Sequence, residues 1–202
     1  LAETAKGARI IIAGRDEVKA KKYARRLGKN VIGMAADASK PKDLAKILKT
    51  NRVDVVVNCA LYYYNLDVMR ACLTTHCHYL DLGGLFHMTR KQLKLDGKFR
   101  KKRLIAILGC GSTPGITNVM AGYGAQHMDK IDTINVRFAD YSWSHPKTHF
   151  VVPYSMYTLF DEFTSKPAVF VGGKMKFVKP MSGRAEEYFP NPVGKVTTFY
   201  TL

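Results

Sequence analysis

Short runs of β-branched apolar residues alternate with amphipathic stretches through the first 127 residues, and this alternation constrains the fold most strongly. The apolar runs are too short for helices and predict strands at residues 9–13, 31–36, 53–58, 78–82 and 104–108. The amphipathic stretches have helical spacing and predict helices at residues 17–27, 41–49, 65–75, 89–102 and 117–127. Strands joined by helices pair in parallel through right-handed crossovers, so the sequence predicts an α/β fold with a doubly wound parallel sheet.

Beyond residue 127 the pattern changes. Residues 132–140 alternate polar and apolar side chains, which predicts a half-exposed strand. Gly172 and Gly173 separate two β-rich runs and predict a hairpin. We therefore expect one domain over residues 1–127 and the start of a second, α+β domain over residues 128–202.

The first predicted domain has the pattern of a dinucleotide-binding fold, but the beginning of the chain lacks the first strand and glycine-rich turn of that fold. A dinucleotide-binding fold starts with a strand, a glycine-rich turn and a helix, yet no G-x-G-x-x-G precedes a helix here. Residues 1–6 look like the end of that first helix, and Gly7 follows them. We interpret the chain as a dinucleotide-binding domain with its first strand missing; a complete protein with a different first unit is the alternative.

The net charge of +16, from 32 Lys plus Arg against 16 Asp plus Glu, has two interpretations. A nucleic-acid-binding protein would concentrate the charge on one face, whereas here it is spread over several predicted helix surfaces, which favours solvated helices. A positive field still favours anionic ligands such as dinucleotides. No run approaches the length of a membrane span, so we expect no membrane association.

The four cysteines form no CxxC pair, which favours reduced thiols in a cytoplasmic protein over disulfides or metal ligands. His76 and His78 lie beside Cys72 and Cys77, but they span a predicted helix end and strand start, so we expect no metal site.

The ends of parallel strands are where ligands bind in open α/β sheets. Gly14 stands where an NAD-selective fold carries an acid, and Arg15 follows it, which favours NADP over NAD. Asp16, one residue later, keeps NAD open, and a solvated loop arginine is the alternative for Arg15.

The next two strand ends carry further candidates for cofactor binding. Asp37, followed by Ala38, either approaches the adenine or caps the helix that starts near Pro41. Asn58, Cys59 and Ala60 offer an amide and two small residues that permit close approach of a ribose or nicotinamide. Tyr62, in a run of three tyrosines, either lines a substrate pocket or packs onto the sheet.

The last two strand ends carry the candidates for chemistry. Asp81, with Tyr79 on the same strand, is a candidate catalytic base, or else a helix cap or salt-bridge partner. Gly83 allows backbone to approach the cofactor. The glycine-rich turn that follows residue 108 offers amide donors to a substrate carboxylate and a side-chain cap to the next helix from Ser112 or Thr117; its candidate substrate-binding residues are Gly111, Ser112, Pro114 and Gly115.

Residues 55–60, 79–84 and 111–118 together resemble the saccharopine dehydrogenase and lysine dehydrogenase family. Residues 153–155, 169–173, 189–190 and 192–194 resemble the start of that family's substrate domain. The resemblance implies NAD(P) bound across a parallel sheet, oxidation of a carbon–nitrogen bond in an amino-acid-type substrate or reduction of the imine, and a homodimer. The substrate domain is expected to dimerise or to cover the cleft, and Tyr154 is the candidate residue for closing the cleft over the substrate.

The chain departs from the glutamate-forming enzymes, which tend to carry acids where it has Thr113 and Thr117, so lysine-type or other amino acids stay open as substrates. Without the phosphate loop we expect the chain alone to be inactive. A non-catalytic module that senses a nucleotide or scaffolds a partner is the rival interpretation.

Overall fold

The computed structural model describes residues 7–139 and 154–202. In the first part, helices and strands alternate: β1 (Ile10–Gly14), α1 (Glu17–Leu27), β2 (Val31–Ala35), α2 (Pro41–Thr50), β3 (Val55–Asn58), the short 3-10 helix η1 (Tyr62–Tyr64), α3 (Asn65–Thr75), β4 (His78–Asp81), α4 (Phe86–Leu93), α5 (Asp96–Lys101), β5 (Ala106–Ile107) and α6 (Ile116–Ala125). The second part contains α7 (Met156–Thr164), β6 (Ala168–Val171), β7 (Lys174–Phe177), β8 (Ala185–Phe189) and β9 (Gly194–Thr198).

All strands of the first part that pair do so in parallel, which confirms the predicted α/β class. One sheet consists of β1 and β2, and the other has the order β3-β4-β5. Within the described residues no strand lies between β1 and β3. The two orders together match the dinucleotide-binding order, in which a further strand occupies that central place.

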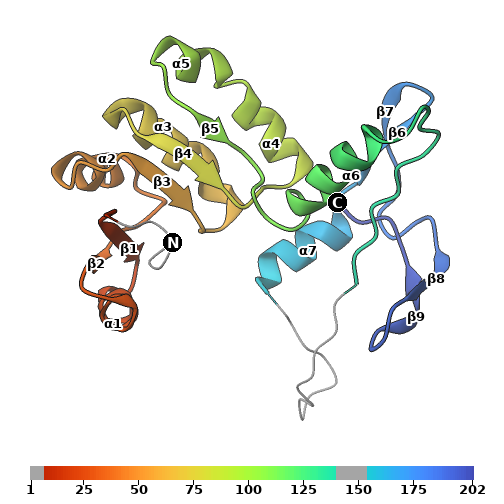
Figure 1. The fold of residues 1–202 in the computed structure, drawn as a ribbon, viewed down its shortest axis with the longest axis horizontal. Coiled ribbons are helices and arrows are strands. Elements are labelled where there is room, and N and C mark those ends of the chain that lie inside the picture. Colours follow the sequence, from red (N-terminus) through yellow and green to blue (C-terminus); the bar gives the residue numbers. More distant parts are fainter. Residues whose placement is uncertain (1–6, 140–153) are drawn as a thin grey trace.

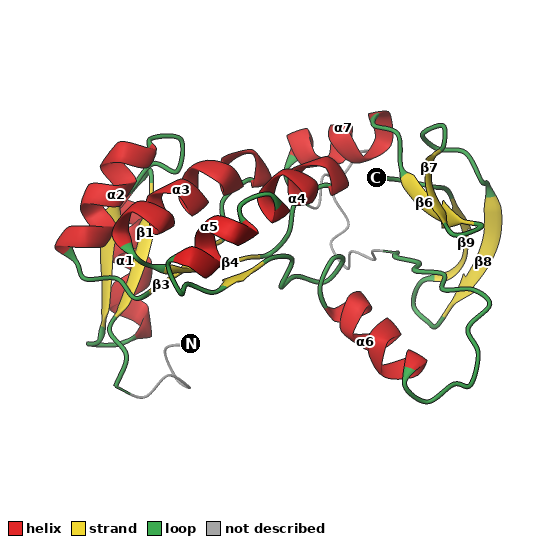
Figure 2. Cartoon of the chain, turned by 90° about the horizontal axis from the view of Figure 1, so that it is seen from above, coloured by secondary structure: helices red, strands yellow, loops and turns green. Residues whose placement is uncertain are grey.

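Helices α3, α4 and α5 cover one face of the β3-β4-β5 sheet (Figure 2). Val56, Tyr79 and Ala106 are neighbours in register on this face and contribute to the main core. The opposite face is open in the described part of the chain, because Val55 and Val57 are 45% and 44% exposed. The successive valines of residues 55–57 are typical of a strand that is buried on both faces, but no described helix packs on this second face.

Two other expectations need correction. The helix expected at residues 89–102 is two helices, α4 and α5, because the chain turns at Lys94 and Leu95, and this turn brings Leu95 against the core. The strand expected at residues 132–140 is absent from its described part, residues 132–139, which forms no backbone pairing with any described strand and keeps its large apolar side chains exposed. Asp140 lies outside the described residues, as does Pro153 of the resemblance motif.

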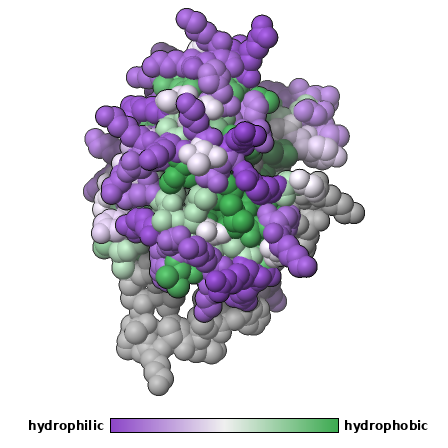
Figure 3. Space-filling view, turned by 90° about the vertical axis from the view of Figure 1, so that its left-hand side faces the viewer, coloured by the Kyte–Doolittle hydropathy of each residue, from purple (hydrophilic) through white to green (hydrophobic). Residues whose placement is uncertain are grey.

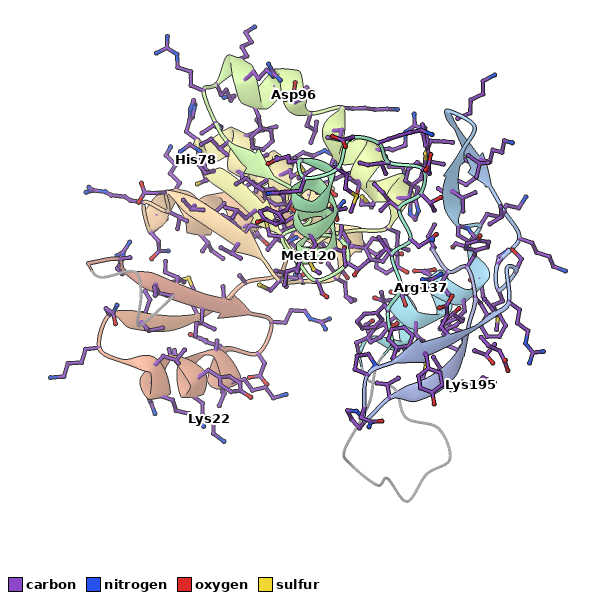
Figure 4. The ribbon with its side chains drawn as sticks, turned by 45° about the vertical axis from the view of Figure 1, so that its right-hand side comes forward. Lys22, His78, Asp96, Met120, Arg137 and Lys195 are labelled. Atoms are coloured by element: carbon purple, nitrogen blue, oxygen red, sulfur yellow. The ribbon has the colours of Figure 1, made fainter. Side chains whose placement is uncertain are left out.

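The predicted hairpin is confirmed: β6 and β7 pair antiparallel, and Gly172 and Gly173 form the turn with positive φ angles of 60° and 75°. Strands β8 and β9 form a second antiparallel pair. Arg137 reaches β8 through an ion pair with Glu187, with Nε and Oε1 2.8 Å apart (Figure 4). Helices α6 and α7 lie between the parallel strands and these hairpins (Figure 1).

Hydrophilic residues predominate on the end of the molecule seen in Figure 3, around a smaller apolar area. No helix in residues 7–139 or 154–202 has the length and apolar character needed to cross a membrane.

Candidate functional site

Gly14 ends β1 beside a surface hollow of about 360 Å³, lined by Ile12, Ala13, Gly14, Arg15, Asp16, Lys19, Ala20 and Tyr23. A Cβ atom added at Gly14 would meet no atom within 4 Å, so the glycine leaves open space at the tip of the strand. Arg15 and Lys19 both line the hollow, so two positively charged side chains border it.

Asp16 is the N-cap of α1, and its Oδ1 accepts a hydrogen bond from the Lys19 backbone N–H at 2.9 Å. Its Oδ2 lies 3.7 Å from the Lys19 Nζ, and both side chains are exposed. Asp16, whose position in the sequence kept NAD possible as the cofactor, therefore has a local structural role as the cap of α1.

Asp37 and Ala38 follow β2. The Asp37 Oδ1 accepts hydrogen bonds from the Ser39 hydroxyl at 2.7 Å and the Ser39 backbone N–H at 2.9 Å. These two bonds lower the pKa of the Asp37 carboxyl. The suggestion that Asp37 caps the next helix was wrong, because Lys40 is the N-cap of α2 and no side chain caps it.

Asn58 ends β3 with its side chain buried, whereas Cys59 and Ala60 are exposed. The Asn58 Oδ1 accepts a hydrogen bond from the Ala60 backbone N–H at 3.2 Å, and its Nδ2 donates to the Asn65 Oδ1 at 2.9 Å. Asn58 therefore holds the loop that carries the two small residues.

Tyr62, the first residue of η1, is buried in an apolar cluster with Leu85 and Met88. Its hydroxyl donates to Asp161 Oδ2 on α7, as does the Tyr63 hydroxyl. Burial, with a further contribution from this bond, raises the pKa of Tyr62. Tyr62 connects the loop after β3 to α7, and it packs on Leu85 and Met88, which lie outside the strands of the sheet.

Asp81 is only 1% exposed. Its Oδ2 accepts from the Tyr79 hydroxyl at 2.9 Å and from Gln92 Nε2 at 2.6 Å, and its Oδ1 accepts from the backbone N–H groups of Gly83 and Gly109 at 2.9 and 2.8 Å. Neither alternative for Asp81, a helix cap or a salt-bridge partner, is found in the described residues. Burial raises the pKa of Tyr79, so its hydroxyl stays protonated and donates.

The glycines of the two adjoining loops fit against the chain itself. A Cβ atom at Gly115 would lie 1.9 Å from the Gly111 carbonyl oxygen, and one at Gly111 would lie 2.3 Å from the Leu82 carbonyl oxygen. A Cβ atom at Gly83 would lie 2.9 Å from Pro114 Cγ. Close packing within the loops therefore explains why glycine is required at these positions, independently of any ligand.

The predicted cap of α6 was wrong. Gly115 is the N-cap, its N–H donates to Asn118 Oδ1 at 3.0 Å, and the Thr117 hydroxyl donates to the Ser112 carbonyl at 3.3 Å. Several amides of the turn are engaged, among them those of Gly109 and Gly115. The candidate donors to a substrate carboxylate are consequently the N–H groups of Ser112 and Thr113.

The structure brings most of the predicted residues together at the strand ends of the three-stranded sheet, and Gly14, Arg15, Asp37 and Ala38 together at those of the two-stranded sheet. Tyr154 lies before α7, where its hydroxyl donates to Glu162. The sequence interpretation missed Asn65, Gln92 and Asp161. Gln92 could have been noticed, since it lies four residues after Met88 on the buried face of α4.

Residues 1–107 match the family model described as the saccharopine dehydrogenase NADP binding domain. The chain is 28% identical to carboxyaminopropylagmatine dehydrogenase from Synechocystis sp. over 191 residues, which cover 90% of this chain and 47% of that protein. It is 27% identical to carboxynorspermidine synthase from Vibrio alginolyticus over 174 residues, which cover 81% of this chain and 42% of that protein.

A solved structure of apo saccharopine dehydrogenase (L-Glu forming) from Saccharomyces cerevisiae shares the fold, with a TM-score of 0.65 at 16% identity, over 98% of this chain and 44% of that one. The chain spans about half the length of the relatives it matches.

Proposed function

Since the chain belongs to the family of the saccharopine dehydrogenase NADP-binding domain, we propose that the protein carrying it is an NADP-dependent oxidoreductase acting on a carbon–nitrogen bond. The observation that carries the choice of NADP is the hollow beside β1, where Arg15 and Lys19 accompany a glycine at the strand tip. A 2′-phosphate needs cations and room, and an acid at the position of Gly14 would repel it.

The residues fit an adenosine 2′-phosphate: Arg15 offers a planar set of donors and Lys19 a second positive charge. The negative charge of Asp16 offsets the positive charge of Arg15 and Lys19 only in part, because the Asp16 carboxylate caps α1. A bound nicotinamide dinucleotide supplies or accepts a hydride at the carbon that bears the nitrogen. The chain's own part is to bind the adenosine end, and to present the loops after β3, β4 and β5 to the reacting groups.

We propose that the substrate is a secondary amine that carries a carboxylate. Two relatives are named for carboxyaminopropylagmatine and carboxynorspermidine, both carboxylated amines by name. The backbone N–H groups of Ser112 and Thr113 are the candidate partners of the substrate carboxylate. Tyr154 is the candidate for closing the cleft, and the protein is proposed to act as a homodimer.

The test is calorimetric titration of the protein carrying this chain with NADP and with NAD. Arg15→Ala should weaken NADP binding by about 1–3 kcal/mol, the scale of a lost charge-assisted hydrogen bond, and leave NAD binding unchanged. Arg25→Ala, in the last turn of α1 and outside the hollow, is the matched control. Equal losses for both dinucleotides would contradict the choice of NADP.

Turnover is tested by the absorbance of the reduced cofactor over a panel of carboxylated secondary amines, amino acids and the matching amine and aldehyde pairs. Reduction of the cofactor with any of them supports the oxidoreductase. Tight NADP binding without turnover on the whole panel would favour the non-catalytic sensor instead.

A further inference from the structure

Five buried polar side chains form one hydrogen-bonded network behind the strand ends of the three-stranded sheet: Asn58, Asn65, Tyr79, Asp81 and Gln92. They come from β3, α3, β4 and α4. No buried side-chain nitrogen or oxygen in residues 7–139 and 154–202 lacks a hydrogen-bond partner. A buried network of this kind is rigid when every member is satisfied.

Asp81 is the centre of this network. Besides the four hydrogen bonds given above, Asn65 Nδ2 lies 3.3 Å from its Oδ2, so five donors surround one carboxylate. A carboxylate has about four lone-pair sites, so Asp81 has no free acceptor left for a proton from a substrate. Because its acceptor positions are occupied, Asp81 is poorly suited to act as a catalytic base, and its contacts favour a different role.

The two backbone donors to Asp81 belong to different loops. Gly83 follows β4, and Gly109 follows β5 and begins the turn that ends at Gly115. Both groups donate to the same oxygen, Oδ1, so a single atom sets the spacing of the two loops. The remaining oxygen is held by Tyr79, Gln92 and Asn65, which fixes the orientation of the carboxylate.

Asn65 and Asn58 extend the connection to a third loop. Asn65 Nδ2 also lies 3.3 Å from the Gly83 carbonyl oxygen, and Asn65 Oδ1 accepts from Asn58. Asn58 Oδ1 in turn accepts from the Ala60 N–H in the loop after β3. One network thus spans the loops at the carboxyl ends of three adjacent parallel strands, where open α/β sheets bind their ligands.

We propose that Asp81 is a positioning residue that fixes the Gly83 loop and the Gly109–Gly115 turn relative to each other for ligand binding. The proposal rests on the proposed function, because it takes these loops to border the substrate and nicotinamide. Asparagine cannot replace the aspartate, since it has one oxygen. Its amide group would face either the two backbone N–H groups or the donors from Tyr79 and Gln92.

The first measurement is hydrogen exchange of the backbone amides in Asp81→Asn, which does not depend on activity. Exchange at residues 82–85 and 108–116 should rise together by about tenfold or more, while α3 stays protected. Asp67→Asn is the matched control, because Asp67 forms an ion pair with Arg70 on the outside of α3. Unchanged exchange in either loop would overturn the proposal.

The second measurement separates positioning from catalysis in the active protein. Positioning predicts that Asp81→Asn raises KM by about tenfold, keeps kcat within about threefold, and leaves the pH profile of kcat unaltered. A fall in kcat of about a hundredfold or more with the loss of one limb of the pH profile would identify a base and overturn the proposal. A lower Tm with unchanged kinetic constants would overturn it too, as a purely structural role.

If Asp81→Asn does not fold, Gln92→Met provides the same test. It removes the 2.6 Å donor to Oδ2 and leaves both backbone bonds to Oδ1 in place. Both loops should then exchange faster together, though less than in Asp81→Asn, and a change confined to α4 would overturn the proposal. If wild type fails to bind NADP or to turn over, the proposed function fails, whereas the exchange result still decides the role of Asp81.

Discussion

Gly14 ends β1 at the position where an NAD-selective fold carries an acid. The backbone there is ordinary and an added Cβ atom would meet no neighbour within 4 Å, so a larger side chain fits without moving the chain. The choice between the two dinucleotides therefore depends on charge at this position rather than on space.

We expect Gly14→Asp to reverse the cofactor preference. The new carboxylate would repel a 2′-phosphate and accept a hydrogen bond from a 2′-hydroxyl, so NADP affinity should fall by about tenfold or more while NAD affinity is retained or rises. Calorimetry with both dinucleotides measures this. Gly14→Ala fills the same space without charge, and a similar change of preference in that variant would show that charge is not the cause.

The four free cysteines provide a test of the core at single residues. Cys72 and Cys77 are fully buried, and burial raises the pKa of the Cys72 thiol to about 12 and that of Cys77 in the same direction. Cys59 and Cys110 are exposed. Since only thiolates react, iodoacetamide at pH 8 should modify the exposed pair in the native protein, and the buried pair only after unfolding. Peptide mass spectrometry identifies the modified cysteines, and early modification of Cys72 would contradict its burial in the core.

At the scale of elements, α1 lies close against β2 because Gly33 has no side chain. A Cβ atom at Gly33 would lie 2.4 Å from the backbone carbon of Ala20 and the backbone nitrogen of Lys21. These are backbone atoms of α1, so the helix itself would have to move away from the strand.

Gly33→Ala should consequently lower the free energy of unfolding by about 1–3 kcal/mol, the scale of overpacking in a core. Gly97→Ala makes the same change in α5, where nothing lies within 4 Å, and should be neutral or stabilising by up to about 1 kcal/mol. Urea unfolding of both variants checks the pair. Equal effects would mean that contact with α1 does not decide the outcome at Gly33.

The elements that the sequence predicted well carry strong local signals. Helices α1 and α3 have the predicted bounds, and α1 has such signals in its cap at Asp16 and its glycine stop at Gly28. The break between α4 and α5 was missed because it depends on Leu95 reaching the core, a contact that local periodicity does not contain. The prediction of a strand at residues 132–140 was wrong for its described part for the opposite reason. The alternation is present, but no described strand pairs with residues 132–139.

The candidate site was predictable in position but not in its interactions. Strand ends located Asn58, Asp81 and the glycine turn, because parallel strands bring their carboxyl ends to one edge. Three of the five donors to Asp81 come from α3, α4 and the loop after β5, and hydrogen bonds at such sequence separations leave no local pattern.

At the scale of the whole molecule, the second part contacts the first at the strand-end loops. Tyr62 and Tyr63 donate to Asp161, and Leu202 packs on the cluster of Tyr62, Leu85 and Met88. The rings of Phe86 on α4 and Phe177 on β7 meet edge to face, with centroids 5.7 Å apart. These contacts border the same loops that the Asp81 network holds, so the association of the two parts and the geometry of the loops should depend on each other.

Asp161 makes this association sensitive to acid. Hydrogen bonds, first from Tyr62 and then from Tyr63, lower the pKa of the Asp161 carboxyl below its ordinary value of 3.8. A group with a lowered folded-state pKa adds stability above its unfolded pKa, and this contribution is lost as the pH falls through the folded value. The contribution is therefore complete at neutral pH and is lost progressively as the pH falls below about 4.

Asp161→Asn keeps the shape of the side chain and cannot ionise. The variant should be less stable than wild type at pH 6–7, and the difference should shrink as the pH is lowered below about 4. Asp132→Asn is the control, because Asp132 is exposed and pairs only with Lys130 in the described residues. Urea unfolding at a series of pH values gives the free-energy differences. A difference between wild type and Asp161→Asn that is the same at pH 3 and pH 7 would mean that the charge of Asp161 does not hold α7 to the tyrosines of η1. The two parts would then be joined mainly by the apolar contacts of Leu202 and Phe177.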